Sequence, residues 1–246
     1  MTSHIHTHVS TINQKYGIET FSCGEEDFHN LSTLLENKMA DNPEWKAEWM
    51  DEHLLRRFLR TFNSVEESAH KICNYFNWRH EEEIDDIDIQ HPIMQQLMAQ
   101  GTNEILDNFY DRCGRPIMII HTARQTKEAD KGEFIFKRAV WHIEQMCKRC
   151  DACALRTFTI IFNMDNFTAG NSDYTFLQRY INAFRDYYPE RIGAALVINY
   201  PPLVYPVWKV AQFWMNKHLR SRFIFCGKQE FNDFIDVEAM PIKLFH

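Results

Sequence analysis

The sequence predicts an α/β fold in which an N-terminal helical subdomain stands beside a mostly parallel sheet covered by helices. Two patterns indicate this. Between residues 51 and 78 apolar side chains recur at helical spacing, whereas after residue 101 short apolar segments alternate with amphipathic ones. That alternation is typical of β-α-β units with right-handed crossovers. The 246 residues suit one compact domain with a helical appendage, or two small domains.

Residues 1–40 show no sustained hydrophobic periodicity, so we expect a mobile N-terminal tail with at most a short helix near residues 30–39. This segment contains His4, His6 and His8. Alternate histidines are able to bind a metal ion, but a polar tail explains them equally well. We expect no metal there.

Residues 41–100 are predicted to form the helical subdomain. Asp51 has the position of an N-cap for a helix whose apolar residues run to Phe62. Ser64 and Glu67 have the spacing of a capping box, which predicts a second helix ending near Trp78. Residues 81–90 are acidic and are expected to link this pair to a short helix at 93–99.

Residues 101–246 are predicted to form the α/β domain. The expected strands are 117–121, 157–163, 195–199 and 222–226, and the expected helices between them are 134–150 and 174–188. The segment 157–163 is rich in Phe, Ile and Thr and is the clearest strand.

The charge of the chain is unevenly distributed. A net charge of −7 argues against general nucleic-acid binding, which needs clustered cations. From Arg191 to Gln229, however, the sequence has no Asp or Glu. Such a basic segment is typical either of a solvated face or of a surface that attracts anionic lipid headgroups. Under the second interpretation Lys209, Lys217 and Arg220 dock the protein on a membrane.

Motifs for catalysis are missing from the sequence. No glycine-rich turn follows the first expected strand, and no Gly-x-Ser-x-Gly elbow is present. Cys147, Cys150 and Cys153 have a spacing that metal sites also use, but no fourth ligand lies near them in sequence. We therefore expect no catalytic residues, no metal and no cofactor, and we do not expect an enzyme.

The helix expected at 207–218 has apolar side chains on more than one face, namely Val207, Trp208, Val210, Ala211, Phe213 and Trp214. A surface helix normally has a single apolar stripe. One interpretation is a helix buried on several sides. The other is a mobile lid that covers a hydrophobic ligand when closed and places Trp and Phe in the lipid interface when open.

The sequence offers no export or spanning segment. Residues 1–10 lack the basic start and apolar core of a secretory signal. The apolar stretch at 192–214 is interrupted by three prolines and a lysine, which argues against a transmembrane helix. We therefore expect a cytoplasmic protein whose thiols are reduced.

Five segments between about residues 45 and 241 form a series of motifs. They are LLRRFLRTFNSVEESAHKICNYFNWR (54–79), DRCGRP (111–116), TIIFNMDNF (159–167), YYPERIGAALVINYPPLVYPVW (187–208) and SRFIF (221–225). In this order they resemble the CRAL-TRIO, or Sec14-like, family of lipid-binding proteins. The fourth segment is the most specific match.

The resemblance implies a lipid pocket that is floored by the sheet and closed by a mobile gate helix at Val207–Leu219. Residues 101–246 are then the CRAL-TRIO lipid-binding domain. The implied pocket residues are Phe158, Ile160 and Phe162 from the strand at 157–163, and Val207, Trp208, Val210, Ala211, Phe213 and Trp214 from the gate.

The resemblance also implies headgroup contacts. Family members that hold phosphatidylinositol use a Glu in the YPER motif and a Lys in the strand after the gate, and these positions are Glu190 and Arg222 here. Arginine keeps the charge of lysine but not its geometry. Thr61, Phe62 and Asn63 stand where phosphoinositide-binding members have a basic run, so phosphatidylinositol is not specified.

The leading hypothesis is a monomer that binds a lipid-like ligand in an internal pocket and exchanges it with membranes at their cytoplasmic surface. The alternative is a protein-interaction or membrane-recruitment module on the same fold. In that case large side chains such as Phe158 and Phe162 fill the cavity.

Overall fold

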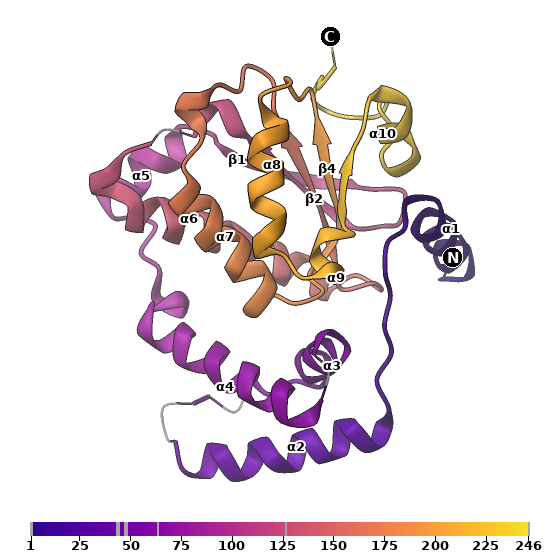
Figure 1. Cartoon of the computed structure of the whole chain (residues 1–246), viewed down its shortest axis with the longest axis vertical. Coiled ribbons are helices and arrows are strands. Elements are labelled where there is room, and N and C mark those ends of the chain that lie inside the picture. Colours follow the sequence, from indigo (N-terminus) through magenta and orange to yellow (C-terminus); the bar gives the residue numbers. More distant parts are fainter. Residues whose placement is uncertain (1, 43–44, 47–48, 63, 126, 246) are drawn as a thin grey trace.

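The computed structural model describes all residues except 1, 43–44, 47–48, 63, 126 and 246. Ten α-helices lie in the described part: α1 (Thr2–Tyr16), α2 (Glu25–Ala40), α3 (Glu52–Thr61), α4 (Val65–Glu81), α5 (Pro92–Ala99), α6 (Gly132–Asp151), α7 (Tyr174–Asp186), α8 (Val204–Ala211), α9 (Lys217–Arg220) and α10 (Lys228–Phe234). The strands there are β1 (Asn103–Tyr110), β2 (Pro116–His121), β3 (Phe158–Asn163), β4 (Ile192–Ile198) and β5 (Phe223–Phe225). Figure 1 shows α2, α3 and α4 as a separate layer below the sheet and its helices.

The five strands form one sheet in the order β1-β2-β3-β4-β5. Strands β2 to β5 are parallel, with Ile119 opposite Ile161 and Ile161 opposite Leu196. Strand β1 runs antiparallel to β2 at the edge. This arrangement confirms the predicted α/β fold with a mostly parallel sheet.

Helices cover both faces of the sheet, which explains why its central strands are apolar on both sides. Along β3, Phe158 and Ile160 face α6, α7 and α8, whereas Ile161 faces α1 and α10. Every residue of β4 is buried. The alternation of side chains along each strand therefore creates two cores, one on each face.

The helical layer is built as its capping residues predict. The Asp51 side chain accepts a hydrogen bond from the Leu54 amide at 2.7 Å and begins α3. The Ser64 hydroxyl accepts one from the Glu67 amide at 3.1 Å and begins α4. Each cap satisfies an amide that has no partner within its helix, so both helices start where the sequence indicates.

A buried arginine joins this layer to the sheet part. Arg79, in the last turn of α4, donates to Glu144 of α6 at 2.8 Å and to Asp85. The hydroxyl of Tyr188 donates to the same Glu144 carboxylate at 2.5 Å. Beside them Trp78 stacks on Tyr187 with ring centroids 4.2 Å apart. The relative placement of the two parts therefore depends on these contacts.

The N-terminal segment differs from its prediction. Residues 2–16 and 25–40 are helical, and Ile12 and Leu31 are buried. Helix α1 packs on α10, where Lys15 pairs with Asp233 at 2.6 Å. The expectation of a tail is corrected for residues 2–16, because partners more than 200 residues away complete a weakly amphipathic helix. Helix α2 contains the short helix expected near residues 30–39 and begins earlier, at Glu25. The division of the chain at residues 40 and 100 stays a prediction.

Strand β1 is a second difference, because no strand is predicted at 103–110. Its pairing with β2 is interrupted between Ile105 and Tyr110, and Asn108 has a left-handed φ of 55°. A bulged edge strand has only one neighbour and is half solvated, so it lacks the apolar run that marks the central strands.

Candidate functional site

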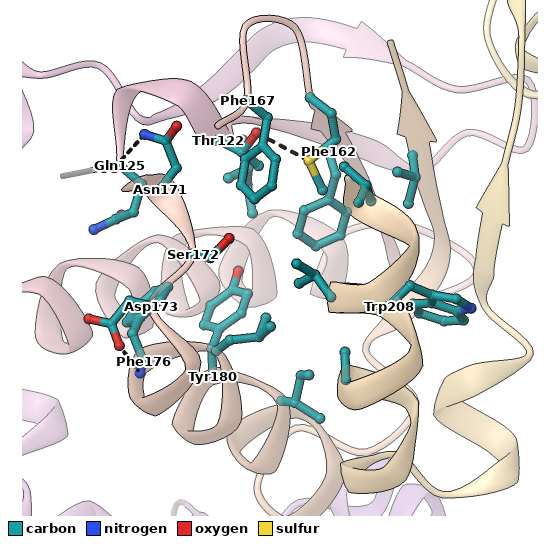
Figure 2. Close-up of a pocket in the computed structure, with 18 of the residues that line it drawn as sticks. Thr122, Gln125, Phe162, Phe167, Asn171, Ser172, Asp173, Phe176, Tyr180 and Trp208 are labelled. Carbon is teal, nitrogen blue, oxygen red and sulfur yellow. Dashed lines mark hydrogen bonds between the residues drawn. The ribbon is translucent and has the colours of Figure 1, made fainter. Parts of the chain in front are cut away.

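An apolar cavity of about 150 Å³ lies between the sheet, α7 and α8. Phe162, Val197 and Phe223 form its floor on the sheet. Figure 2 shows Phe176 and Tyr180 of α7 on one side of the cavity and Trp208 of α8 on the other. The space beneath α8 is therefore not filled by side chains of the described part of the chain.

The floor follows from the alternation of side chains along β3. Of the strand residues predicted to line a pocket, Phe158, Ile160 and Phe162 all point to this face of the sheet. Only Phe162 reaches the cavity. Phe158 and Ile160 are fully buried in the core below it, where the Phe158 ring packs on Phe184 with centroids 6.4 Å apart. These two residues support the floor.

Helix α8 covers the cavity with one of its faces. The residues that line the cavity are Val204, Val207, Trp208 and Ala211, spaced so that they share one side of the helix. The Trp208 ring packs against Phe223 and Phe225 of β5, with centroids 5.4 and 5.1 Å apart. Three of the predicted gate residues, Val207, Trp208 and Ala211, are thus brought to the cavity.

The other predicted gate residues lie elsewhere. Val210 is exposed and Phe213 is 85% exposed, so both face away from the cavity. Trp214 is half-buried against the core, and its carbonyl accepts a hydrogen bond from Arg185 at 2.8 Å. The helix expected at 207–218 is shorter because it ends at Ala211, and Asn216 caps the separate helix α9 by accepting from the Leu219 amide.

Glu190 and Arg222 lie close together, outside the apolar cavity. The Glu190 carboxylate pairs with Arg60 of α3 at 2.5 Å. Arg222 donates to the Glu19 carbonyl at 2.7 Å and to the His218 ring at 3.0 Å. Burial raises the pKa of the Glu190 carboxyl and lowers the pKa of Arg222 to about 10. Glu190 precedes β4 and Arg222 precedes β5, so both lie at the amino-terminal edge of the sheet.

A second cavity, of about 370 Å³, begins at these two residues. It has an excess of cations, since Glu190 is accompanied by Arg57, Arg60, Arg115, Arg156 and Arg222 in its lining. Arg57 is 7% exposed and makes no ion pair or hydrogen bond with the described residues. Burial lowers the pKa of Arg57 to about 10, so it remains charged at neutral pH. Nothing in the local sequence marks Arg57, because its surroundings come from distant segments.

The three predicted docking cations differ in their surroundings. Lys209 is exposed beside the ring of Tyr205, with its Nζ 4.9 Å from the ring centroid. Arg220 is exposed at the end of α9. Lys217 is exposed too, but it pairs with Glu19 at 2.6 Å.

His218 of α9 is a buried histidine in contact with Arg222. Arg222 can only donate, so the His218 Nε2 must accept and the ring is neutral. The neighbouring charges are Glu190, at 3.7 Å from Nε2, together with Glu19 and Arg60, while the Phe21 ring packs on the imidazole. Burial lowers the pKa of His218 to about 4.

We expect the free energy of unfolding to fall as the pH drops from about 6.5 to about 4, because the unfolded chain binds the His218 proton more readily. His142, whose pKa burial also lowers to about 4, adds to this loss. His218→Gln should therefore remove only the part of this pH-dependent loss that comes from His218, which is about 2 kcal/mol of unfolding free energy between pH 7 and pH 5. Urea unfolding at the two pH values measures the difference. The exposed His70→Gln is the control, and equal pH dependence of His218→Gln and wild type would contradict the prediction.

The fold and the cavity define an α/β domain that encloses an apolar space beneath a short covering helix. Residues 100–244 match the family model described as the CRAL/TRIO domain, which is more than half of the chain. The chain therefore belongs to the CRAL-TRIO family. Within the described residues no helix is long and apolar enough to cross a bilayer. Nor do three or more His, Cys, Asp or Glu side chains of that part gather where they could hold a metal ion.

Several known proteins are similar to this chain. The phosphatidylinositol transfer protein CSR1 of Eremothecium gossypii is 26% identical over 144 residues, which are 55% of this chain and 31% of that protein. A CRAL-TRIO domain-containing protein of Schizosaccharomyces pombe is 29% identical over 182 residues, which are 70% of this chain and 40% of that protein. The chain thus spans less than half the length of these two relatives.

The fold is also similar to a solved structure. The crystal structure of Sfh5 superimposes with a TM-score of 0.61 at 13% sequence identity, over 82% of this chain and 79% of that chain. At this identity the similarity concerns the fold alone.

Proposed function

We propose that the chain binds one lipid-like molecule in the cavity beneath α8 and exchanges it with membranes. The observation that carries this proposal is the apolar cavity itself, which the side chains of a fully packed domain would fill. Each methylene group of an acyl chain that enters it contributes about 0.8 kcal/mol. Binding of this kind needs no catalytic group. The family and a relative named as a phosphatidylinositol transfer protein support the same class of function.

For a phospholipid, we propose that the headgroup lies near Glu190 and Arg222. A small pocket of about 10 Å³ lies between the two regions, because its lining includes Phe184 and Leu219 of the apolar cavity together with Glu190 and Arg222 of the cationic one. A negatively charged headgroup would complement the arginine excess of the second cavity. Phosphatidylinositol is one candidate to test.

The outer face of the gate supports membrane docking. Tyr205, Val210 and Phe213 are exposed apolar side chains on or next to α8, and Lys209 lies among them. An apolar surface with a nearby cation is suited to the boundary between headgroups and acyl chains of an anionic membrane. We propose that this face inserts when the ligand is exchanged, and that the protein acts as a peripheral, cytoplasmic monomer.

Within the family, we propose a closer relationship to the CRAL-TRIO domain of motile sperm domain-containing protein 2. The segment VWKVAQFW (207–214) and the ending FNDFIDVEAMP (231–241) support it, because their spacing looks similar.

Phe213→Glu should slow lipid exchange about tenfold, because an exposed phenylalanine that enters the interface contributes roughly 1.5–3 kcal/mol when fully buried. The measurement is transfer of a fluorescent phosphatidylcholine between donor and acceptor vesicles that contain phosphatidylserine. Tyr110→Glu, which changes an exposed aromatic residue on the edge strand β1, is the matched control. Equal transfer rates of Phe213→Glu and wild type would show that the outer face of α8 is not part of the docking surface. A wild-type protein that transfers no lipid would contradict the proposed function.

A further inference from the structure

The apolar cavity has a buried cation at one end. Arg138 of α6 lines the cavity and is 1% exposed. Its guanidinium donates to four neutral acceptors, the Leu97 carbonyl at 3.4 Å, Gln100 Oε1 at 3.2 Å, Thr102 Oγ1 at 3.2 Å and Gln125 Oε1 at 2.5 Å. These bonds tie α6 to α5, to the segment before β1 and to the turn after β2, but none of them brings a negative charge.

No carboxylate of the described residues is in contact with the Arg138 guanidinium, although the more distant Glu128 stabilises its charge electrostatically. The guanidinium forms no ion pair with the described residues, and its Nε, which is buried, has no hydrogen-bond partner among them. Two carboxylates near this end are engaged elsewhere, since Glu128 pairs with Lys131 and Asp173 accepts from the Phe176 amide. A buried cation without a counterion costs several kcal/mol. Burial lowers the pKa of Arg138 only to about 10, so the charge persists at neutral pH.

Tyr180 adds a free donor to the same region. Its hydroxyl is buried and has no hydrogen-bond partner among the residues that the structure describes. Figure 2 shows Tyr180 rising from α7 with its hydroxyl directed toward the cavity near Ser172. Arg138 and Tyr180 both line the apolar cavity, so the two groups face one space. Burial raises the pKa of Tyr180, and the phenol therefore keeps its proton for donation.

We propose that the preferred ligand is an acidic amphiphile whose anionic oxygen group, a carboxylate or a phosphate, binds Arg138 and Tyr180 while its hydrocarbon chain occupies the apolar cavity. A neutral hydrocarbon, ester or alcohol of the same length would leave the cation and the hydroxyl uncompensated. This inference rests on the proposed lipid binding and narrows the class of ligand.

The position of this subsite distinguishes it from the headgroup region. Gln125 and Asn171, which line the same end, follow the carboxyl-terminal ends of β2 and β3. Glu190 and Arg222 precede β4 and β5, at the opposite edge of the sheet. A ligand anchored at Arg138 therefore directs its chain toward the region of Glu190 and Arg222.

The test compares three ligands with the same chain, oleic acid, oleyl phosphate and oleyl alcohol, titrated at pH 7.5 into the lipid-free protein. We expect both acids to bind at least about tenfold more tightly than the alcohol, since a hydrogen bond to a charged group is worth roughly 1.5–3 kcal/mol. The tighter of the two acids identifies the group as a carboxylate or a phosphate. Arg138→Met should remove the preference for acids and leave binding of the alcohol unchanged.

Tyr180→Phe is the second variant, because it removes only a hydroxyl without a partner and preserves the fold if Arg138→Met does not fold. We expect it to weaken binding of the preferred acid about tenfold. Tyr110→Phe, which changes an exposed tyrosine on the edge strand β1 outside the lining, should bind like wild type. Equal affinity of wild type for acids and alcohol, or no effect of Tyr180→Phe, would overturn this inference alone if phospholipid is still taken up. Uptake of no lipid at all would overturn the proposed function with it.

Discussion

Ala211→Trp is expected to prevent lipid uptake. Ala211 is buried, lies on the inner face of α8 and lines the cavity. An indole at this position has to occupy a space of only about 150 Å³ between α8 and the sheet, so it competes directly with an acyl chain. We expect the fraction of protein that carries lipid after incubation with vesicles to fall about tenfold or more, which corresponds to about 1.4 kcal/mol or more of binding free energy.

Val210→Trp is the matched control for this variant. Val210 precedes Ala211 on α8, but its side chain is exposed on the outer face. The same indole placed there leaves the cavity open, so lipid occupancy at equilibrium should equal that of wild type, even if the indole changes the rate of exchange at the proposed docking face. Similar occupancy in Ala211→Trp and Val210→Trp would show that the ligand, if one binds, lies outside this cavity.

Arg79→Met is expected to lower the free energy of unfolding by about 3–5 kcal/mol. The substitution removes the buried cation that pairs with Glu144 and Asp85 and leaves both carboxylates without it. Because the Tyr188 hydroxyl also donates to Glu144, the loss extends across the junction between α4 and the sheet part. Urea unfolding followed by circular dichroism measures the effect.

The comparison variant is Arg149→Met, which removes an ion pair of similar length, 2.7 Å to Asp107, from the surface. Both of its side chains are well exposed, so a loss of no more than about 1 kcal/mol is expected. If the two variants lose the same stability, the contacts of Arg79 do not hold the two parts together as described.

Local patterns predicted those parts of the structure that depend on nearby residues. Asp51 and Ser64 begin their helices because a capping side chain needs only the amide three residues later. The central strands were predictable because burial on both faces makes them continuously apolar. The identity of the face that Phe162 occupies follows from the alternation along its strand.

Features that depend on distant partners were missed. Helix α1 is completed by α10, and β1 is a bulged edge strand whose sequence is half polar. The apolar residues of the predicted gate could not be divided into inner and outer ones, because the end of α8 at Ala211 sets which of them face the sheet. Arg57 and Arg138 resemble ordinary surface arginines in the sequence, and only the packed structure surrounds them with buried cavities.

The most direct test of lipid binding is native mass spectrometry of the protein after incubation with vesicles of mixed phospholipids and fatty acids. The proposed function predicts a complex whose mass exceeds that of the chain by one lipid, and predicts that Ala211→Trp is recovered without it. A wild-type protein that is recovered only in its lipid-free form, while remaining folded, would contradict lipid binding in the cavity beneath α8.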